Sequence, residues 1–359
     1  MGSITLLTVI GARPQFIKAA AVSREVRERD DIIETLVHTG QHFDPNMSDV
    51  FFDELDIPKP HYHLGFGGGS HGAMTGRMLE GIEKIILEGK PDFVLVYGDT
   101  NSTLAGALAA VKLHVPIAHV EAGLRSFNRR MPEEINRILT DHAADILFSP
   151  TITASRNLQN EGISPSHIHQ VGDVMYDAAL YYRARSKRPE WWQDIPENYV
   201  LATIHRAENV DDPNRLSKIF KGIEASGRNV ILPVHPRTRK ALAERGQTIP
   251  ANIKVVDPVG YLEMIWLIDN CDMVLTDSGG LQKEAYFFEK LCLTMRDETE
   301  WVETVEAGWN VLVGSNRDKI CQEIQHRSPM RGLQPNLYGN GNAAKKILDT
   351  LIDEANILQ

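Results

Sequence analysis

The sequence predicts an α/β protein built from two doubly wound domains, each with a parallel sheet. Short apolar runs alternate with longer segments in which apolar residues recur every three or four positions, almost from end to end. This alternation falls into two series, one in each half of the chain. The length of 359 residues suits about two domains of roughly 150 residues each.

The first series begins close to the N-terminus. Strand-like apolar runs occupy residues 4–10, 32–38, 93–97, 116–120 and 146–148. Polar or Gly-containing turns follow these runs, and residues 16–29 and 102–113 then show the apolar spacing of helices. We therefore expect a first domain over residues 1–172.

The second series predicts a second domain over residues 173–342. Its strand-like runs occupy residues 199–204, 230–234, 253–256, 273–276, 291–295 and 311–313. The stretch 171–198 contains a basic cluster, two prolines and the pair Trp191–Trp192, which indicates an exposed connection. The last segment, 343–359, is expected to form a helix that packs back on the first domain.

Composition and charge exclude several classes of protein. With 38 Lys+Arg against 48 Asp+Glu, the net charge is −10 at pH 7, so capture of nucleic acid by bulk electrostatics is not expected. No run approaches the roughly 20 apolar residues of a membrane span, and the N-terminus lacks a signal-peptide profile. The three cysteines form no Cys-x-x-Cys pair, which favours buried thiols. We expect a soluble, cytoplasmic protein without membrane partners.

Charged side chains follow the expected strands of the first domain. Arg13 and Lys18 lie near the start of the helix after the first strand, where an anion is stabilised. Asp99 and Glu121 follow two later strands, and Glu133 lies in the first turn of another helix. Each acid alone is typical of a helix cap or a solvated charge. Crowded carboxylates raise one another's pKa, however, so together they suit general acid–base chemistry.

Complementary groups follow strands of the second domain. They are His205, Arg206, His235, Ser278, Gly279, Gly280 and Glu284. Ser278 can cap a helix, and the two glycines let a phosphate approach bare backbone N–H groups. Two such sheets facing each other would form one central cleft, because ligands of parallel sheets bind beyond the strands' carboxyl ends. Histidine pairs such as His61/His63 have no third ligand at a recognised spacing, so no metal is expected.

These motifs resemble one family, the non-hydrolysing UDP-N-acetylglucosamine 2-epimerases. The match spans nearly the whole chain, in order and with compatible spacing. The matching motifs are GARPQFIK at 11–18, HTGQHF at 38–43, GDTNSTLAGALAA at 98–110, HVEAGLRS at 119–126, PEEINR at 132–137, HRAEN at 205–209 and DSGGLQKEA at 277–285.

The resemblance implies two Rossmann-like domains in the glycosyltransferase B arrangement, with a UDP-sugar substrate between them. It implies a reaction that uses no nicotinamide, metal or other cofactor. A base removes the C2 proton while UDP leaves C1, which gives a 2-acetamidoglucal. UDP then adds back, and C2 is reprotonated on the opposite face. We also expect a homodimer.

Matching the motifs residue by residue implies the following roles. Proton transfer and support of the intermediate fall to Asp99, Glu121, Glu133 and His205, with the face served by each carboxylate left open. Substrate binding falls to Arg13, Lys18, Arg137, Arg206, His235, Ser278, Gly279, Gly280, Glu284 and Arg296. Some family members also have a regulatory site, and Gln41, His42 and Arg77 lie near its matching positions.

Departures from the commoner family form concern the substrate. Ala12 and Gln15 replace residues of a GTRPE motif, residues 300–303 lack an Arg-Pro pair, and Gln-Lys-Glu at 282–284 is less acidic. These variants resemble the branch acting on UDP-2,3-diacetamido-2,3-dideoxyglucuronate for surface polysaccharide synthesis, such as lipopolysaccharide O-antigen. In that interpretation Gln15 accommodates an added substrate carboxylate. UDP-N-acetylglucosamine is the alternative substrate. The same motifs leave open a hydrolysing epimerase, a glycosyltransferase of the same fold and a sugar-nucleotide sensor.

Overall fold

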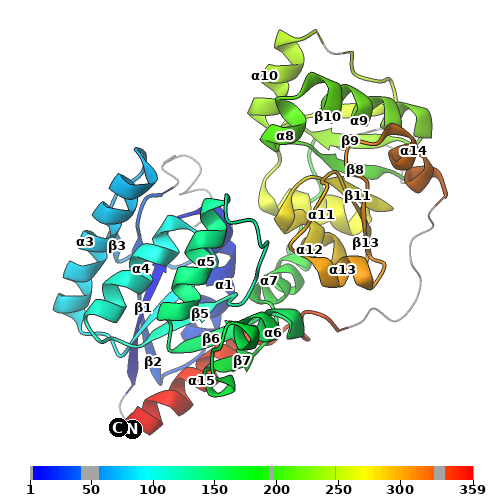
Figure 1. The fold of residues 1–359 in the computed structure, drawn as a ribbon. Coiled ribbons are helices and arrows are strands. Elements are labelled where there is room, and N and C mark those ends of the chain that lie inside the picture. Colours follow the sequence, from blue (N-terminus) through cyan, green and yellow to red (C-terminus); the bar gives the residue numbers. More distant parts are fainter. Residues whose placement is uncertain (1–2, 42–55, 194–197, 247, 327–335, 359) are drawn as a thin grey trace. The chain divides into compact units, whose positions relative to one another are not determined.

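A computed structural model describes residues 3–41, 56–193, 198–246, 248–326 and 336–358. The chain forms two compact units, of which unit 1 comprises Met1–Ala178 with Asn336–Gln359 and unit 2 comprises Ala179–Pro335 (Figure 1). Each unit contains a parallel sheet with helices packed on it. The predicted fold class of two Rossmann-like α/β domains is confirmed.

Unit 1 holds a seven-stranded sheet in the order β3-β2-β1-β4-β5-β6-β7. Its strands are β1 (Ile4–Ile10), β2 (Ile32–His38), β3 (Tyr62–His63), β4 (Phe93–Tyr97), β5 (Ile117–Val120), β6 (Ile146–Ser149) and β7 (Ile168–Gln170). The order reverses at β1, so the carboxyl ends of β1, β4 and β5 lie next to one another. In parallel sheets this is where ligands bind.

The helices of unit 1 alternate with these strands. They are α1 (Arg13–Arg27), α3 (His71–Gly89), α4 (Asn101–Lys112), α5 (Pro132–Ala143), α6 (Ile152–Asn160), η1 (Pro165–His167), α7 (Val174–Arg183) and α15 (Ala343–Leu358). The α15 helix packs against α1, and Asp349 accepts a hydrogen bond from Arg29 at 2.6 Å. The C-terminal helix therefore belongs to unit 1.

Successive side chains of β1 point to opposite faces of this sheet, and their contacts show which helices cover each face. Leu7 and Val9 join a buried cluster with Met78 and Ile82 of α3, so α3 and α4 cover one face. Thr8 points the other way and donates to Glu34 at 2.6 Å. Helix α1 packs against β1 and β2, and none of its described residues belongs to that cluster, which places α1 on the opposite face.

Unit 2 holds a six-stranded sheet in the order β10-β9-β8-β11-β12-β13. Its strands are β8 (Val200–Thr203), β9 (Val230–Pro233), β10 (Ile253–Val256), β11 (Met273–Thr276), β12 (Leu291–Thr294) and β13 (Asn310–Leu312). Its helices are α8 (Ala207–Val210), α9 (Pro213–Ser226), α10 (Pro236–Glu244), α11 (Tyr261–Asn270), α12 (Gly279–Phe287), α13 (Val302–Glu306) and α14 (Arg317–His326).

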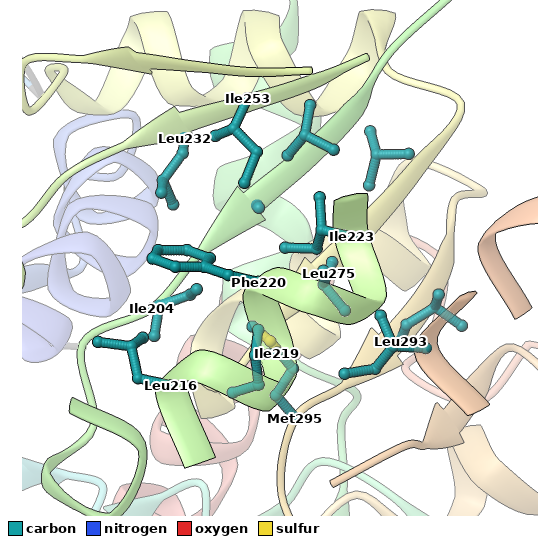
Figure 2. Packing of buried hydrophobic residues seen from close by; sticks show 14 of the residues in the cluster. Ile204, Leu216, Ile219, Phe220, Ile223, Leu232, Ile253, Leu275, Leu293 and Met295 are labelled. Atoms are coloured by element: carbon teal, nitrogen blue, oxygen red, sulfur yellow. The ribbon is translucent and has the colours of Figure 1, made fainter. Parts of the chain in front are cut away.

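Helix α9 shows how apolar spacing builds the core of unit 2. Leu216, Ile219, Phe220 and Ile223 recur at three- and four-residue intervals and point toward strand residues that include Leu232 (Figure 2). Asp212 caps the helix by accepting from the backbone N–H groups of residues 214 and 215, with Pro213 at its start. Burying this face against the sheet fixes the strand ends that carry the polar groups described below.

Several expectations differ from the observed structure. The strands β3 and β7 were not expected, because they are short and their residues lie partly or fully exposed. Within the stretch 171–198, α7 forms a helix, and Trp192 is buried against Trp266 with ring centroids 4.7 Å apart. The expectation of an exposed Trp192 was therefore wrong.

The boundaries of the units also differ from those expected at residues 172 and 342. Unit 1 runs to Ala178, inside α7, and resumes at Asn336. Backbone hydrogen bonds explain part of this difference, because the backbone N–H of Asp173 donates to the carbonyl of Tyr338 at 2.9 Å. Among the described residues, none of the helices has the length and apolar character needed to cross a membrane.

Candidate functional site

In unit 1, Lys18 and Glu121 form a buried ion pair at the carboxyl end of the sheet. Lys18 lies in the second turn of α1, and Glu121 directly follows β5. Both side chains are about nine-tenths buried, with exposed fractions of 10% and 8%. Glu121 has a φ of 71°, in the left-handed region that residues with a Cβ rarely adopt. The local fold thus holds this carboxylate in a strained position against a cation.

Gly98 makes room for this pair. Its φ is 62°, and a Cβ on it would lie 3.0 Å from Lys18 Nζ and 3.3 Å from a carboxylate oxygen of Glu121. Glycine is required on both counts, because it accepts positive φ and leaves space for the two charged atoms. Gly98 precedes Asp99, so the same turn positions the second candidate acid.

Asp99 is held by a cation from a different helix. Arg137 of α5 donates to Asp99 at 2.5 Å and to Glu134 at 2.9 Å. Asn136, also on α5, donates to the backbone carbonyl of Asp99 at 2.9 Å. Asp99 keeps 29% of its side chain exposed, whereas Arg137 keeps 9%. The structure therefore brings together Asp99 and Arg137 and leaves the acid accessible.

The neighbouring glutamates of α5 have different surroundings. Glu134 is buried and accepts backbone hydrogen bonds from Ser126 and Phe127 at 2.9 and 2.8 Å. Burial raises the pKa of Glu134, but these bonds and Arg137 outweigh it and hold that pKa below its usual value. Glu133 is exposed at the N-terminal end of α5, and no described residue pairs with its carboxylate. Sequence reasoning named Glu133 and missed Glu134 as the anchor of Arg137.

The side chain of Gln15 bonds groups of the protein itself, so the predicted effect of Gln15 on a substrate carboxylate does not act through a direct hydrogen bond. Its side chain is buried, and its oxygen accepts from the N–H groups of Gly11 and Ala12 at 2.8 and 3.0 Å. Its amide donates to the carbonyl of Tyr97 at 2.9 Å and to the Thr103 hydroxyl at 3.0 Å. All of its hydrogen-bonding capacity thus joins the start of α1 to the end of β4.

In unit 2, the buried carboxylate of Asp277 organises the ends of β8 and β11. It accepts from the backbone N–H groups of His205 at 3.1 Å and of Arg206 at 3.0 Å, and from the side chain of Asn209 at 3.1 Å. The ring of His205 lies 3.5 Å from Asp277 and is 40% exposed. Sequence reasoning missed this role of Asp277. The signal that could have found it is an acidic residue directly after β11, the strand that pairs with β8, which leads to His205.

The start of α12 gathers the phosphate-binding candidates of unit 2. Ser278 caps this helix by accepting from the N–H of residue 281. A Cβ on Gly279 would lie 2.5 Å from a carboxylate oxygen of Glu300, and Arg296 donates to Glu300 at 2.8 Å. Burial raises the pKa of Glu300, but Arg296 and the more distant Arg206 hold it below its usual value. Arg206, Arg296 and the helix start therefore share one electrostatic environment.

Residues where the sequence departs from the common family form contact one another here. Trp301 donates through Nε1 to the carbonyl of Gly279 at 2.9 Å, and Lys283 Nζ lies 4.2 Å from the centre of its ring. Glu284 is buried on the same helix. The two departures thus form one packed contact at the start of α12.

Of the remaining candidates, His235 lies near the His205 ring, and the others lie elsewhere in unit 1 or outside the described residues. His235 is exposed, with its ring centroid 6.1 Å from that of His205. Arg13 begins α1, but its side chain lies outside the described part, as does His42. Gln41 accepts from Ser102, and Arg77 donates to the carbonyl of Gly68 at 2.8 Å. Within the described ranges, no three His, Cys, Asp or Glu residues cluster as metal ligands would.

The chain is similar to known proteins along almost its whole length. A model of the family described as UDP-N-acetylglucosamine 2-epimerase matches residues 24–352. The UDP-2,3-diacetamido-2,3-dideoxy-D-glucuronate 2-epimerase of Pseudomonas aeruginosa is 56% identical over 353 residues, which cover 96% of this chain and 99% of that protein. A UDP-N-acetylglucosamine 2-epimerase homolog of Methanococcus maripaludis is 53% identical over 356 residues, with the same coverage of 96% and 99%.

A solved structure extends the similarity to the fold. The crystal structure of Methanocaldococcus jannaschii UDP-GlcNAc 2-epimerase in complex with UDP-GlcNAc and UDP superposes with a TM-score of 0.85 at 42% sequence identity. The match covers 98% of this chain and 99% of that one. The similarity therefore includes both units and the strand ends that carry the candidate residues.

Proposed function

The chain belongs to the UDP-N-acetylglucosamine 2-epimerase family, and on that premise we propose that it inverts C2 of a UDP-2-acetamido sugar without hydrolysing it. The proposed substrate is UDP-2,3-diacetamido-2,3-dideoxyglucuronate, converted from the gluco to the manno epimer for surface polysaccharide synthesis. The 56% identity with the Pseudomonas aeruginosa enzyme of that name supports this choice. UDP-N-acetylglucosamine is the alternative, supported by the 53% identity with the Methanococcus maripaludis homolog.

One observation carries the proposed reaction: Asp99 and Glu121 follow the adjacent strands β4 and β5, and each is paired with a different cation. Inversion at C2 requires a proton to leave one face of the sugar and another to arrive on the opposite face. Two separately held carboxyl groups can supply these two transfers. Glu133, exposed at the start of α5, is a third candidate, and the face that each acid serves stays open.

The chemistry requires electrostatic support as well as a base. A base takes the C2 proton, the C–H electron pair forms the C1=C2 double bond, and the C1–O bond breaks with its pair leaving on UDP. UDP then adds back to C1 and restores the C1–O bond on its original face, while a proton delivered to the opposite face of C2 forms the new C2–H bond. Because the C2 proton is only weakly acidic, cations must stabilise the departing diphosphate. No redox change occurs and no co-reactant is consumed.

The two units divide these tasks in our proposal. Unit 1 supplies the proton-transfer groups, with Lys18, Arg13 and Arg137 near the sugar. Unit 2 holds UDP: the N–H groups at Gly279 and Gly280, together with Arg206 and Arg296, neutralise the diphosphate, and Glu284 binds the ribose. His205, whose backbone is fixed by Asp277, supports the leaving group, with His235 close to it. The electrostatic environment that Arg206 and Arg296 share with the start of α12 supports this division.

We further propose a homodimer in the cytoplasm. Burial raises the pKa of the Cys271 and Cys292 thiols to about 12, so they stay protonated and unreactive, as suits a reducing compartment. Light scattering at several protein concentrations measures the mass; one 40.2 kDa chain would contradict the dimer.

The substrate is tested by a side-by-side assay of the two UDP-sugars, with products identified by NMR. We expect conversion of the diacetamido-uronate to its C2 epimer and a lower kcat/KM for UDP-N-acetylglucosamine. A higher kcat/KM for UDP-N-acetylglucosamine would support the alternative. Accumulation of free UDP with a reducing sugar would instead identify a hydrolysing enzyme, and turnover only with an added acceptor would identify a glycosyltransferase.

A further inference from the structure

The buried ring of His119 in β5 contacts two groups that can only accept hydrogen bonds. Its Nδ1 lies 2.7 Å from a carboxylate oxygen of Asp141, and its Nε2 lies 2.8 Å from the backbone carbonyl of Gly98. The side chain has 0% exposure, so water cannot replace either partner. A neutral imidazole carries hydrogen on only one nitrogen, whereas these contacts use a donor on both.

The surroundings of Asp141 favour its ionised form, which has no proton to share with His119. Its second oxygen accepts from Arg125 Nη1 at 2.6 Å and from the N–H of Gly123 at 3.1 Å. Independently of His119, the buried guanidinium of Arg125 lowers the pKa of Asp141 against the opposing effect of burial. A carboxylate in this position requires N–H donors, including one from the His119 ring.

The carboxylates of Asp141 and Glu161 balance the charges of Arg125 and a protonated His119. Arg125 also donates to Glu161 through two bonds of 2.7 Å, and His142 lies 3.1 Å from Glu161. With Asp141 and Glu161 ionised, Arg125 and a protonated His119 leave the cluster electrically neutral. Removing the proton from His119 would leave a ring nitrogen's lone pair facing either a carboxylate or a carbonyl, without water to relieve it.

The same bond reaches the candidate active site. Gly98 is the residue before Asp99, and its backbone lies against the Lys18–Glu121 pair. Glu121 itself lies two residues beyond His119 in the chain. The ring of His119 therefore fixes the carbonyl of Gly98, whose positive-φ turn presents Asp99. His119 itself lies in β5, and Glu121 follows the end of that strand.

We propose that His119 is a buried imidazolium that positions the turn carrying Asp99 and the strand end carrying Glu121. His119 is a positioning residue, because it acts through Gly98 and contacts no reacting atom. Its role in turnover rests on the proposed function, whereas its protonation state does not.

The protonation state is tested on the wild-type protein. Long-range ¹H–¹⁵N NMR of the ¹⁵N-histidine-labelled full chain at pH 7.5 distinguishes doubly protonated rings from the two neutral tautomers. We expect the signals of one ring that carries hydrogen on both nitrogens, with both hydrogens exchanging slowly with solvent. These signals should be absent from the spectrum of the urea-unfolded chain at the same pH. A neutron crystal structure assigns the ring directly. A His119 ring with hydrogen on only one nitrogen would overturn the proposal.

The positioning role is tested by His119→Asn, whose donors both lie on one nitrogen and so cannot span from Asp141 to the carbonyl of Gly98 as the two ring nitrogens do. We expect kcat to fall by about 100-fold with KM close to that of the wild type, because substrate contacts remain while the acids shift. His326→Asn, which changes an exposed histidine of unit 2, is the matched control. Folded His119→Asn with unchanged kcat would overturn the positioning role. If this variant does not fold, the wild-type spectrum still decides the protonation, and a wild type without epimerase activity would contradict only the proposed function.

Discussion

Arg137 donates to Asp99 at 2.5 Å and to Glu134 at 2.9 Å, so a single buried cation joins an accessible acid to an inaccessible one. Glu134 is itself fixed by the backbone N–H groups of Ser126 and Phe127. The orientation of Asp99 is therefore set by contacts in α5 and in the loop before it. A proton-transfer group requires such fixed geometry.

Replacing Arg137 should impair turnover more than stability. Arg137→Met removes the partner of Asp99 and leaves the backbone bonds of Glu134 intact, so we expect kcat to fall by about 100-fold. Steady-state kinetics measure this change. Arg130→Met, which changes an exposed arginine in the same region, is the control and should keep wild-type kcat. Equal activity of the two variants would show that the Arg137 contact is not needed.

A methyl group at Gly98 should disrupt the site. Gly98→Ala forces a Cβ into the space beside Lys18 Nζ and onto a residue with positive φ, so we expect a loss of about 1–2 kcal/mol and a large drop in kcat. Gly76→Ala is the matched control, because Gly76 lies exposed inside α3 with no atom within 4 Å of an added Cβ. That control should gain about 0.5–1 kcal/mol. Urea unfolding and kinetics measure both, and a harmless Gly98→Ala would refute the crowding argument.

Gln15 should affect stability and leave substrate choice unchanged. Gln15→Glu replaces the amide that donates to the carbonyl of Tyr97 with a buried carboxylate oxygen, which we expect to cost about 1–3 kcal/mol. Denaturant unfolding measures the cost. The ratio of kcat/KM values for the two UDP-sugars should stay unchanged. A changed ratio with unchanged stability would restore the idea that Gln15 faces the substrate.

Asp177 should make stability depend on pH between its unfolded pKa of 3.8 and its folded pKa of about 6. Burial raises its pKa from 3.8 to about 6, despite a bond from the N–H of Ala344, and its other oxygen is buried without a hydrogen-bond partner. A raised pKa in the folded state means that stability is greatest below the unfolded pKa and falls as pH rises through about 6. Asp177→Asn keeps the acceptor and removes the charge.

We therefore expect Asp177→Asn to be more stable than the wild type by about 1–3 kcal/mol at pH 8, and by less at pH 5. Urea unfolding at the two pH values measures the difference. Asp353→Asn, on the exposed side of α15, is a control that should show little change at either pH. A gain for Asp177→Asn that does not grow with pH would contradict the assignment.

The sequence predicted most of the fold because apolar periodicity reports burial directly. The buried strands β1 and β8 follow runs of apolar residues, and so do their neighbours. In contrast, β3 consists of Tyr62 and His63, which are exposed, so no apolar run marks it. Trp192 was misjudged because its partner Trp266 is distant in the sequence, and only tertiary packing buries it.

The candidate site was partly predictable for a related reason. Acids at the ends of adjacent strands, such as Asp99 and Glu121, can be placed from strand order alone. The identity of their partners depends on helix packing, which spacing does not reveal. The partners of Gln15 could not be predicted, because a polar residue near a strand end can equally face the ligand or bond to the backbone, and the carbonyl of Tyr97 that it contacts is remote in sequence.

Deuterium incorporation tests the central claim most directly. The wild-type enzyme is incubated with UDP-2,3-diacetamido-2,3-dideoxyglucuronate in deuterated water, and the product is analysed by NMR and mass spectrometry. We predict one solvent deuterium at C2 of the epimerised product. We also predict that Asp99→Asn and Glu121→Gln each slow this incorporation by about 10²–10⁴-fold, because each loses a proton-transfer group. An epimerised product that carries no deuterium at C2 would contradict proton removal and return.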